Sequence, residues 1–255
     1  NHADHIRPEV AMEAQHLSGE GFEDISFQLH KGEVLAITGL QGSGRDELAD
    51  ALFGVIPARG RLSFGGQTLE NARNIKFHMK HGVALVPRMR KERGIHDDLS
   101  IIDNMSMAFL NTKWKKLLIS GRAERERFAR QQKALQIKAG SPANPITSLS
   151  GGNQQKVILG KWLETDAEVL LFDNPTQGID VGTKFEIYHL ILELAKQGKA
   201  IIVFSSEFPE IYKVADSCMV LYKGRVNAVM SREEMTEKNV MYYSTGANVE
   251  GAKNA

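Results

Sequence analysis

The chain of 255 residues is 42% hydrophobic, which is enough apolar surface for one folded domain with an attached subdomain. Its 32 basic and 31 acidic residues leave a net charge of +1, so bulk electrostatics do not predict nucleic acid as a partner and any anion site must be local. Cys218 is the sole cysteine, which excludes an intrachain disulfide, and no apolar run approaches the roughly 18 residues that span a bilayer.

The first part of the chain predicts a strand-rich region. Residues 1–10 are polar and lack periodicity, so we expect a linker there, and the opening at Asn1 rather than at Met is typical of a piece of a longer protein. Apolar runs and alternation predict strands at residues 11–17, 22–29, 34–38, 60–64 and 83–86, with helices after Gly44 and near residues 74–80.

The later part of the chain alternates strands with helices after a helical insert. Patterns at residues 101–110 and 122–139 predict helices with no strand between them, as part of a helical subdomain at about residues 88–164. Strands are expected at residues 169–172, 200–204, 217–222 and 225–230. The helix after the first of these has a capping-box pattern, Thr183 with Glu186, and Gly198 is placed to end it. This alternation predicts an α/β fold with a mostly parallel sheet, followed by a tail at residues 246–255.

A glycine-rich loop, GLQGSGRD, follows the strand at residues 34–38. Gly39 and Gly44 occupy the fixed positions of the phosphate-loop pattern G-x-x-x-x-G-K-[ST], so we expect a backbone nest that holds phosphates. Arg45 replaces the lysine of that pattern with a broad planar guanidinium, and Asp46 replaces the hydroxyl residue that binds Mg²⁺. A carboxylate about 4 Å from a phosphate charge is disfavoured by roughly 4 kcal/mol at an effective dielectric near 20. Nucleotide binding should therefore be weak or unusually metal-dependent.

The octet LSGGNQQK, from Leu149 to Lys156, is a second candidate for anion binding. Ser150 can cap the helix that follows, and Gly151 and Gly152 let its first N–H groups approach a ligand closely. A helix N-terminus with bare amides attracts anions. For Ser-Gly-Gly alone an ordinary capped helix is the simpler interpretation, and it is the full octet that favours a binding role. Further along, the apolar strand from Val169 delivers the carboxylate of Asp173, as in strands that hold Mg²⁺ in phosphate-loop enzymes.

Taken in order, these motifs resemble the ATP-binding cassette (ABC) family over about residues 11–245. The segments GFEDISF, GLQGSGR, SLSGGNQQK, PTQGIDVG and SSEFPEI are most similar to the second, C-terminal cassette of double-cassette importers of monosaccharides such as ribose, xylose or galactose. The resemblance implies an ABC-type nucleotide-binding domain with a phosphate-loop core sheet, an N-terminal antiparallel β-subdomain and a helical subdomain. It also implies ATP and Mg²⁺ as cofactors.

The resemblance assigns roles to particular residues. The nucleotide would contact Gly39, Leu40, Gln41, Gly42, Ser43, Gly44, Arg45, Asp46, Arg88 and Asp173, of which Asp173 and Asp46 are the metal candidates. The signature would contact the γ-phosphate of a nucleotide held by a second cassette, through Leu149, Ser150, Gly151, Gly152, Asn153 and Gln154. Asp180, in the loop that links the two ATP sites, would belong to the same site. Phe22 is either the aromatic that stacks on adenine or a core residue.

Several positions depart from an active cassette besides Arg45 and Asp46. Asn174 stands where the family has a glutamate that polarises the attacking water, and Ser206 aligns with the switch histidine. An amide cannot accept a proton at neutral pH, and losing a general base costs on the order of 100- to 10,000-fold in rate. Arg88 follows Val86-Pro87, where a glutamine usually senses the membrane partner. We therefore expect a degenerate site with little or no hydrolysis, beside a signature that completes the ATP site of the partner cassette.

The resemblance also implies partners and a location. The partners would be an N-terminal cassette in the same full-length chain or a cassette dimer, integral membrane permease subunits, and indirectly a periplasmic or lipoprotein sugar-binding protein. The domain would lie at the cytoplasmic face of the cell membrane, with the permease docked near residues 88–110. Ile101 and Met105 would either face that permease or pack internally. No nucleic acid is expected.

Alternatives to this interpretation stay open. Nucleoside and autoinducer importers share the architecture, so the substrate class is less certain than the family. A soluble ABC-family protein acting in translation or DNA maintenance is a second possibility, although the balanced charge and the lack of a basic face argue against it. A third is a non-hydrolysing pseudo-ATPase that serves as an interaction module.

Overall fold

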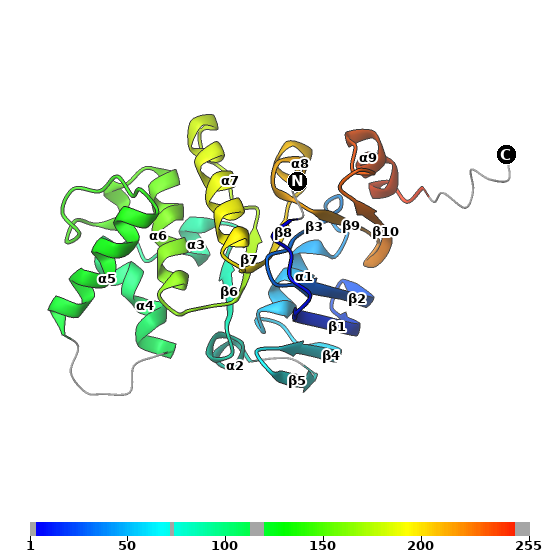
Figure 1. Ribbon diagram of the computed structural model, residues 1–255, viewed down its shortest axis with the longest axis horizontal. Coiled ribbons are helices and arrows are strands. Elements are labelled where there is room, and N and C mark those ends of the chain that lie inside the picture. The colour runs from blue at the N-terminus through cyan, green and yellow to red at the C-terminus, as the bar shows by residue number, and fades with distance from the viewer. Residues whose placement is uncertain (1–3, 72–73, 113–119, 248–255) are drawn as a thin grey trace, which may run out of the picture.

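The computed structural model describes residues 4–71, 74–112 and 120–247. Two sheets share one end of the molecule, and a group of helices forms the other (Figure 1). This arrangement confirms the expected α/β fold with an antiparallel β-subdomain and a helical subdomain. None of the helices within the described ranges is long and apolar enough to cross a membrane.

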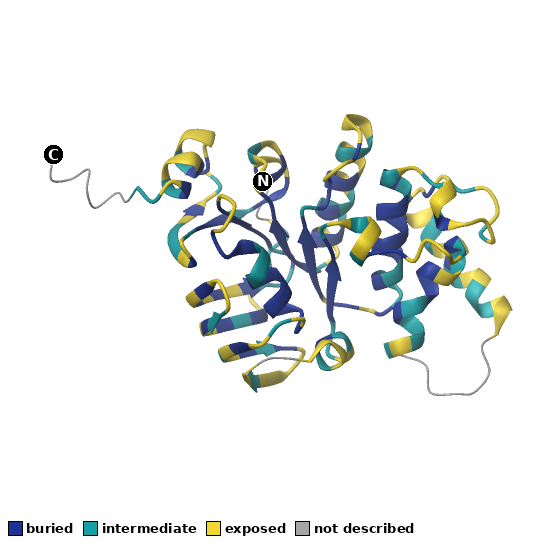
Figure 2. Ribbon diagram, turned by 180° about the vertical axis from the view of Figure 1, so that it is seen from behind, coloured by how far each residue is buried: buried dark blue, intermediate teal, exposed yellow. Residues whose placement is uncertain are grey.

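The smaller sheet is antiparallel and has four strands in the order β2-β1-β4-β5. These are β1 (Val10–Gly19), β2 (Phe22–His30), β4 (Ala58–Phe64) and β5 (Gln67–Glu70). Buried and exposed residues alternate along much of β2 and β4, as expected for a sheet with one face in the core (Figure 2). The sequence did not predict β5, because this edge strand has no buried residue and so shows no alternation.

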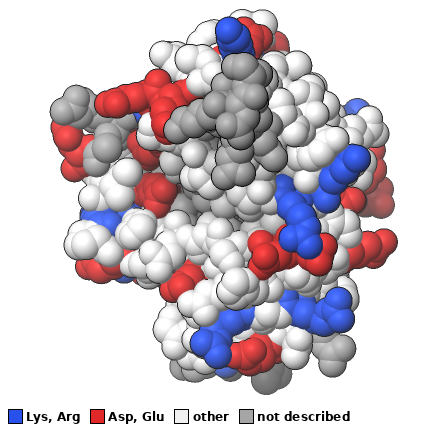
Figure 3. Space-filling view, turned by 90° about the vertical axis from the view of Figure 1, so that its right-hand side faces the viewer, with Lys and Arg blue, Asp and Glu red and all other residues white. Residues whose placement is uncertain are grey.

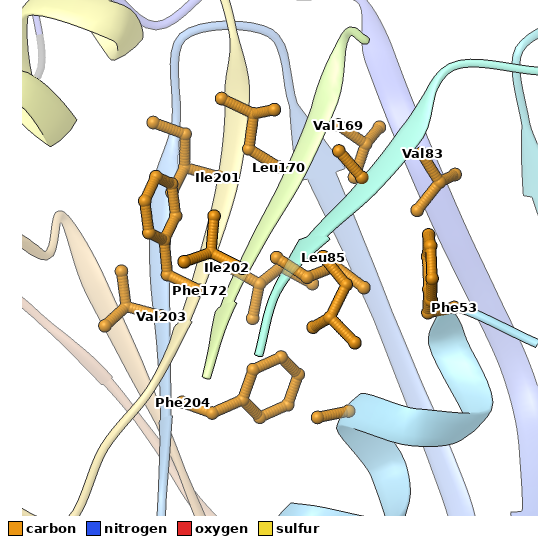
Figure 4. Close-up of a cluster of buried hydrophobic side chains, with 14 of the residues drawn as sticks. Phe53, Val83, Leu85, Val169, Leu170, Phe172, Ile201, Ile202, Val203 and Phe204 are labelled. Carbon is orange, nitrogen blue, oxygen red and sulfur yellow. The ribbon is translucent and has the colours of Figure 1, made fainter. Parts of the chain in front are cut away.

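The larger sheet has six strands in the order β10-β9-β3-β8-β7-β6. All neighbours from β9 to β6 are parallel, and only β10 runs antiparallel to β9. The strands are β3 (Val34–Thr38), β6 (Val83–Val86), β7 (Val169–Asp173), β8 (Ala200–Phe204), β9 (Ser217–Tyr222) and β10 (Arg225–Ser231). Every residue of β3, β6, β7 and β8 is buried, which explains their continuous apolar runs. Figure 4 shows side chains from three of these strands packed together with Phe53.

Helix α1 (Arg45–Leu52) begins at the end of the glycine-rich loop and packs between the two sheets. It contacts β1 and β2 on one side and β7 and β8 on the other. Leu48, Ala49, Ala51 and Leu52 are fully buried there. The start of this helix is therefore fixed by both sheets, and with it the position of the glycine-rich loop.

The helical subdomain contains a short helix, three longer helices and a 3₁₀ turn. These are α3 (Arg90–Arg93), α4 (Ile101–Thr112), α5 (Gly121–Ala134), η1 (Ile146–Ser148) and α6 (Gly151–Leu163). Helix α5 ends five residues before its predicted end, and Ile137 is buried without being helical. Ile101 and Met105 are fully buried, so they pack internally rather than forming a surface for a partner.

Helix α7 (Val181–Lys196) begins earlier than predicted. Its N-cap is Asp180, whose carboxylate accepts hydrogen bonds from the main-chain N–H of Thr183 at 3.0 Å and from its hydroxyl at 2.7 Å. The prediction of Thr183 as the capping residue was wrong, because a stronger cap stands three residues before it. Gly198, at φ +95°, follows the end of the helix as expected. The remaining helices are α2 (Ile75–Lys80), α8 (Phe208–Val214) and α9 (Glu237–Ser244).

Ordered contacts begin before residue 11. The main-chain N–H of Arg7 donates to Lys31 O at 2.8 Å, that of Lys31 donates to Glu9 O at 2.9 Å, and β1 starts at Val10. The end of the expected linker is thus part of the fold. Of the expected tail, residues 248–255 lie outside the described residues.

Candidate functional site

The glycine-rich loop forms a tight turn between β3 and α1. Gly42 and Gly44 adopt φ angles of +81° and +89°, the left-handed region that favours glycine. A Cβ atom on Gly44 would overlap the main-chain oxygen of Gly21. The N–H of Gly224 donates to Ser43 O at 2.9 Å, so the loop is held against both β-rich parts of the domain. The loop therefore forms a tight turn that depends on its glycines, between a strand and a helix as the sequence predicted.

A groove runs over this loop and brings together residues that are far apart in the sequence. Its wall consists of Leu40, Gln41, Gly42, Ser43, Gly44, Arg45, Asp46, Glu47, Arg88, Met89, Asn174, Gln177 and Ser206. The parallel strands explain this grouping, because β3, β6, β7 and β8 all end at the same edge of the sheet. Most of the nucleotide-contacting positions expected from the sequence thus line one groove.

Arg45 is turned toward the protein rather than toward the groove opening. Its side chain is about nine-tenths buried, and Nη1 donates to Gly39 O at 3.2 Å. Its Nε and Nη2 each donate to Asp46 Oδ1 at 3.3 Å. The guanidinium is therefore hydrogen-bonded to one main-chain oxygen of the loop and to the neighbouring carboxylate.

Arg88 forms the centre of the site. Its Nη1 lies 2.5 Å from Asp173 Oδ2, its Nη2 lies 2.9 Å from Asp50 Oδ2, and its Nε lies 3.8 Å from Asp46 Oδ2. Nη1 also donates to the main-chain oxygen of Asp46 at 3.4 Å. Arg93 joins the cluster through Nη2, 2.6 Å from Asp50 Oδ1. Three arginines and three aspartates, namely Arg45, Arg88, Arg93, Asp46, Asp50 and Asp173, thus form one charge-balanced group.

The electrostatics of this group follow from burial. Asp173 is fully buried, and this desolvation raises its pKa to about 6 even though Arg88 acts in the opposite direction. Desolvation alone would lower the pKa of Arg88, but the hydrogen bonds that it donates to Asp50 and Asp173 outweigh this effect, so its pKa is raised and it stays charged. Removing one partner of a buried ion pair costs about 3–5 kcal/mol, so the Arg88–Asp173 pair is costly to open.

Sequence reasoning missed Asp50, and it placed Arg93 only in a basic cluster with Arg88 that is either solvated or near the phosphates. Asp50 lies four residues after Asp46 on α1, which places both carboxylates on one face of the helix. That spacing was a usable signal. The pairing of Asp50 with Arg88 could not be predicted, because these two residues are 38 positions apart and no local pattern joins them.

The residues expected to hold Mg²⁺ do not fit that ion in this arrangement. Oδ2 of Asp173 faces the Arg88 guanidinium, and its Oδ1 accepts a hydrogen bond from Asn174 Nδ2 at 3.1 Å. Oδ1 of Asp46 accepts from Arg45. Mg²⁺ requires an octahedral shell of oxygen ligands at about 2.0–2.1 Å, whereas these carboxylates surround a cation that already neutralises them.

Asn174 and Ser206 stand at the groove beside Asp173. Asn174 has a φ of 46°, a left-handed conformation that asparagine tolerates better than most residues, and its N–H donates to Phe204 O at 2.8 Å. Ser206 is exposed, whereas the preceding Ser205 is fully buried. Neither side chain can act as a strong general base at neutral pH. Phe22 is 3% exposed and belongs to the core, which favours its structural interpretation.

The signature octet forms the start of α6, on the helical subdomain. Ser150 is exposed and caps the helix by accepting a hydrogen bond from Asn153 N at 3.4 Å, which confirms its predicted capping role. Asn153 also donates from Nδ2 to Ser150 Oγ at 3.0 Å. No octet residue belongs to the described wall of the groove, so the phosphate loop and the signature are two separate surfaces of this domain.

Three polar or small residues of the signature have internal contacts. A Cβ atom on Gly152 would overlap Thr183 of α7, so its missing side chain permits close helix packing. Gln154 is buried, and its Oε1 accepts from Arg90 Nε at 3.1 Å. Gln155 donates from Nε2 to Pro175 O at 2.8 Å. These contacts connect the signature helix to α3, to α7 and to the loop after β7.

A sequence profile of the family described as ABC transporter matches residues 22–177. The chain therefore belongs to the ABC transporter family.

Relatives with high similarity are named as sugar-import proteins. The chain is 42% identical over 240 residues to the ribose import ATP-binding protein RbsA 1 of Streptomyces coelicolor, covering 93% of this chain and 47% of that protein. It is 42% identical over 244 residues to a putative ribose/galactose/methyl galactoside import ATP-binding protein of Geobacillus kaustophilus, covering 95% and 48%. The chain thus spans about half the length of these relatives.

Solved structures support the fold. A nucleotide-free ATP-binding cassette from an ABC transporter superposes with a TM-score of 0.78 at 20% identity, covering 91% of this chain and 95% of that one. A dimeric ATP-binding cassette bound to ADP and Pi gives a TM-score of 0.74 at 17% identity, covering 87% and 98%. At these identities the likeness is one of fold alone.

Proposed function

We propose that this domain is the second cassette of a double-cassette ABC importer for a monosaccharide. Three observations support the proposal: the names of the sugar-import relatives, the coverage of about half of their length, and the motifs that resemble the C-terminal cassette. In this assignment the domain lies at the cytoplasmic face of the membrane and works with permease subunits and, indirectly, with a sugar-binding protein.

The proposed division of labour assigns different roles to the two surfaces. The domain's own phosphate loop contributes to a degenerate site that binds ATP weakly and hydrolyses little or none. Its signature completes the ATP site of the partner cassette. The observation that carries this proposal is the contrast between the two surfaces. Arg88 forms ion pairs with Asp173 and Asp46, whereas Ser150 at the N-terminus of α6 is exposed.

A non-hydrolysing interaction module is the second candidate, and the charge-balanced cluster favours it. With the carboxylates of Asp46, Asp50 and Asp173 paired with three arginines, this group carries no net charge that would attract a Mg-nucleotide. Calorimetry on the full-length chain would support this candidate if the domain took up no Mg-ATP even beside its partner cassette.

ATPase assays on the full-length chain with its permease test the proposed division. Ser150→Arg places a large cation at the cap of α6, where it blocks the approach of the partner's nucleotide, so turnover should be abolished. Arg45→Ala should reduce turnover less, because the affected site contributes little hydrolysis. The reverse ranking of the two variants would refute the assignment.

A further inference from the structure

The wall of the groove contains a cation that belongs to the protein itself. Arg88 reaches the site from the end of β6, between the buried carboxylate at the end of β7 and the two aspartates of α1. Its side chain is 18% exposed and lines the groove beside the glycine-rich loop. The guanidinium therefore faces both the carboxylates and the space above the loop.

We propose that Arg88 acts as the resident cation of this phosphate-loop site, in the place where other phosphate-loop proteins hold Mg²⁺, so that nucleotide binding here does not depend on a divalent metal. The inference rests on the proposed function in one respect, namely that the groove receives the phosphates of a nucleotide. It goes beyond that function by naming the charged species the site accepts: a nucleotide polyphosphate without its metal ion.

The hydrogen-bond geometry leaves donors for such a ligand. A guanidinium has five N–H groups. In Arg88, Nη1 donates to Asp173 and to the main-chain oxygen of Asp46, while Nη2 donates to Asp50. One N–H of Nη2 and the N–H of Nε have no hydrogen bond described, and the Nε is 3.8 Å from Asp46 Oδ2. Arginine is well suited to phosphate oxygens because its charge is permanent and its donors lie in one plane.

The charge balance explains why a metal is not also required. Asp46 and Asp173 would repel a polyphosphate, and a metal normally relieves that repulsion. Here Arg88 and Arg45 already neutralise both carboxylates. A Mg²⁺ ion would have to displace Arg88 from Asp173 and Asp46 together, and the freed guanidinium would then compete with the ion for the same phosphate oxygens.

Photolabelling of the full-length chain with 8-azido-ATP tests the inference, with labelled peptides of this cassette identified by mass spectrometry. Labelling of the wild-type cassette should change by less than about twofold when Mg²⁺ is replaced by EDTA. Arg88→Gln removes the cation and frees Asp173, so its labelling should fall about tenfold on chelation. Arg93→Gln is the comparison variant, because Arg93 pairs with Asp50 rather than with Asp173 or Asp46, and its labelling should fall clearly less on chelation than that of Arg88→Gln.

Three outcomes overturn the inference. Wild-type labelling that falls about tenfold in EDTA would show that the site requires a metal. An Arg93→Gln variant that becomes as metal-dependent as Arg88→Gln would assign the effect to the cluster rather than to Arg88. Absence of labelling with and without Mg²⁺ would exclude nucleotide at this loop, while the Ser150→Arg assay would still decide the proposed role of the signature. If Arg88→Gln does not fold, the wild-type comparison in EDTA and Mg²⁺ decides alone.

A second measurement uses Mn²⁺ as a spectroscopic substitute for Mg²⁺. Electron paramagnetic resonance on the nucleotide-saturated full-length chain should detect one fewer bound Mn²⁺ than bound nucleotide. Arg88→Gln should make the two numbers equal, because Asp173 then loses the guanidinium that faces its Oδ2 and can bind the ion. Equal numbers in the wild type would contradict the inference.

Discussion

Gln155 donates a hydrogen bond from its side-chain Nε2 to the main-chain oxygen of Pro175 at 2.8 Å, and both residues are buried. This bond joins the signature helix α6 to the loop that follows β7, two residues after Asp173. This bond therefore connects the signature helix to the segment that carries the Asn174 and Gln177 wall of the groove, across the boundary of the helical subdomain.

Replacing Gln155 with Met should destabilise the protein by about 1–3 kcal/mol, because Pro175 O would lose its donor in a buried position while the side-chain volume is kept. Urea unfolding followed by circular dichroism measures this change. Gln177→Met is the control, since Gln177 is exposed, and it should shift the unfolding free energy by less than about 0.5 kcal/mol. Equal effects of the two variants would contradict a structural role for the Gln155 bond.

Gly152→Ala should destabilise the protein by about 1–3 kcal/mol, because the added methyl group overlaps Thr183 on α7. Thr183→Ser removes the overlapping methyl and keeps the hydroxyl that donates to Asp180 at 2.7 Å. In a double-mutant cycle, Thr183→Ser should therefore recover part of the loss. Strictly additive effects would mean that the two residues do not limit helix packing.

Asp173 should give the protein a distinctive pH dependence. Its pKa is about 6 in the folded state and near 3.8 when exposed, so between these values the folded state holds a proton that the unfolded state has lost. The Asp173 contribution to the free energy of unfolding is thus present below about pH 4 and is lost as the pH rises through 6, by on the order of 1–3 kcal/mol. Urea titrations at several pH values should show this slope in the wild type and a flatter profile in Asp173→Asn. Identical profiles would show that Asp173 titrates normally.

Cys218 offers a probe for the opening of β9. It is fully buried, and burial raises the pKa of its thiol to about 12, so the reactive thiolate is scarce in the folded state. Reaction with a thiol reagent should be at least about 1,000-fold slower in buffer than in urea, because it requires local or global unfolding. Since the chain has no other cysteine, the signal is unambiguous. Rapid reaction in buffer would show that β9 is not stably paired.

Elements with a clear apolar signal could be predicted with their boundaries. β3, β6, β8 and β9 occupy the predicted ranges, because strands buried on both faces are continuous apolar runs. The edge strand β5 and the short helix α3 were missed, since neither has a buried residue that would reveal a period. The start of α7 was misplaced because Asp180 competes with Thr183 as a cap.

The sequence predicted which residues belong to the candidate site, but it did not predict which of them pair with one another. The motif order identified Arg88, Asp173 and Asp46 as neighbours, and the groove brings two of them to one wall. Arg88 pairs with the carboxylates because the fold brings the ends of β6 and β7 close to one face of α1. No local sequence pattern shows this proximity.

The surface charge could be judged from composition. Acidic and basic side chains are interspersed on the end of the molecule seen in Figure 3.

The closed set of ion pairs around Arg88 also limits how this domain can evolve. Substituting any one of the six charged residues leaves a partner with unbalanced charge in a largely buried place, which is destabilising before any new chemistry is gained. A site that holds a metal ion in place of the guanidinium would need coordinated changes at Arg88, Arg45 and Asp46. The arrangement of charges around Arg88 is therefore hard to change by single substitutions, and we expect these six positions to vary together rather than one at a time.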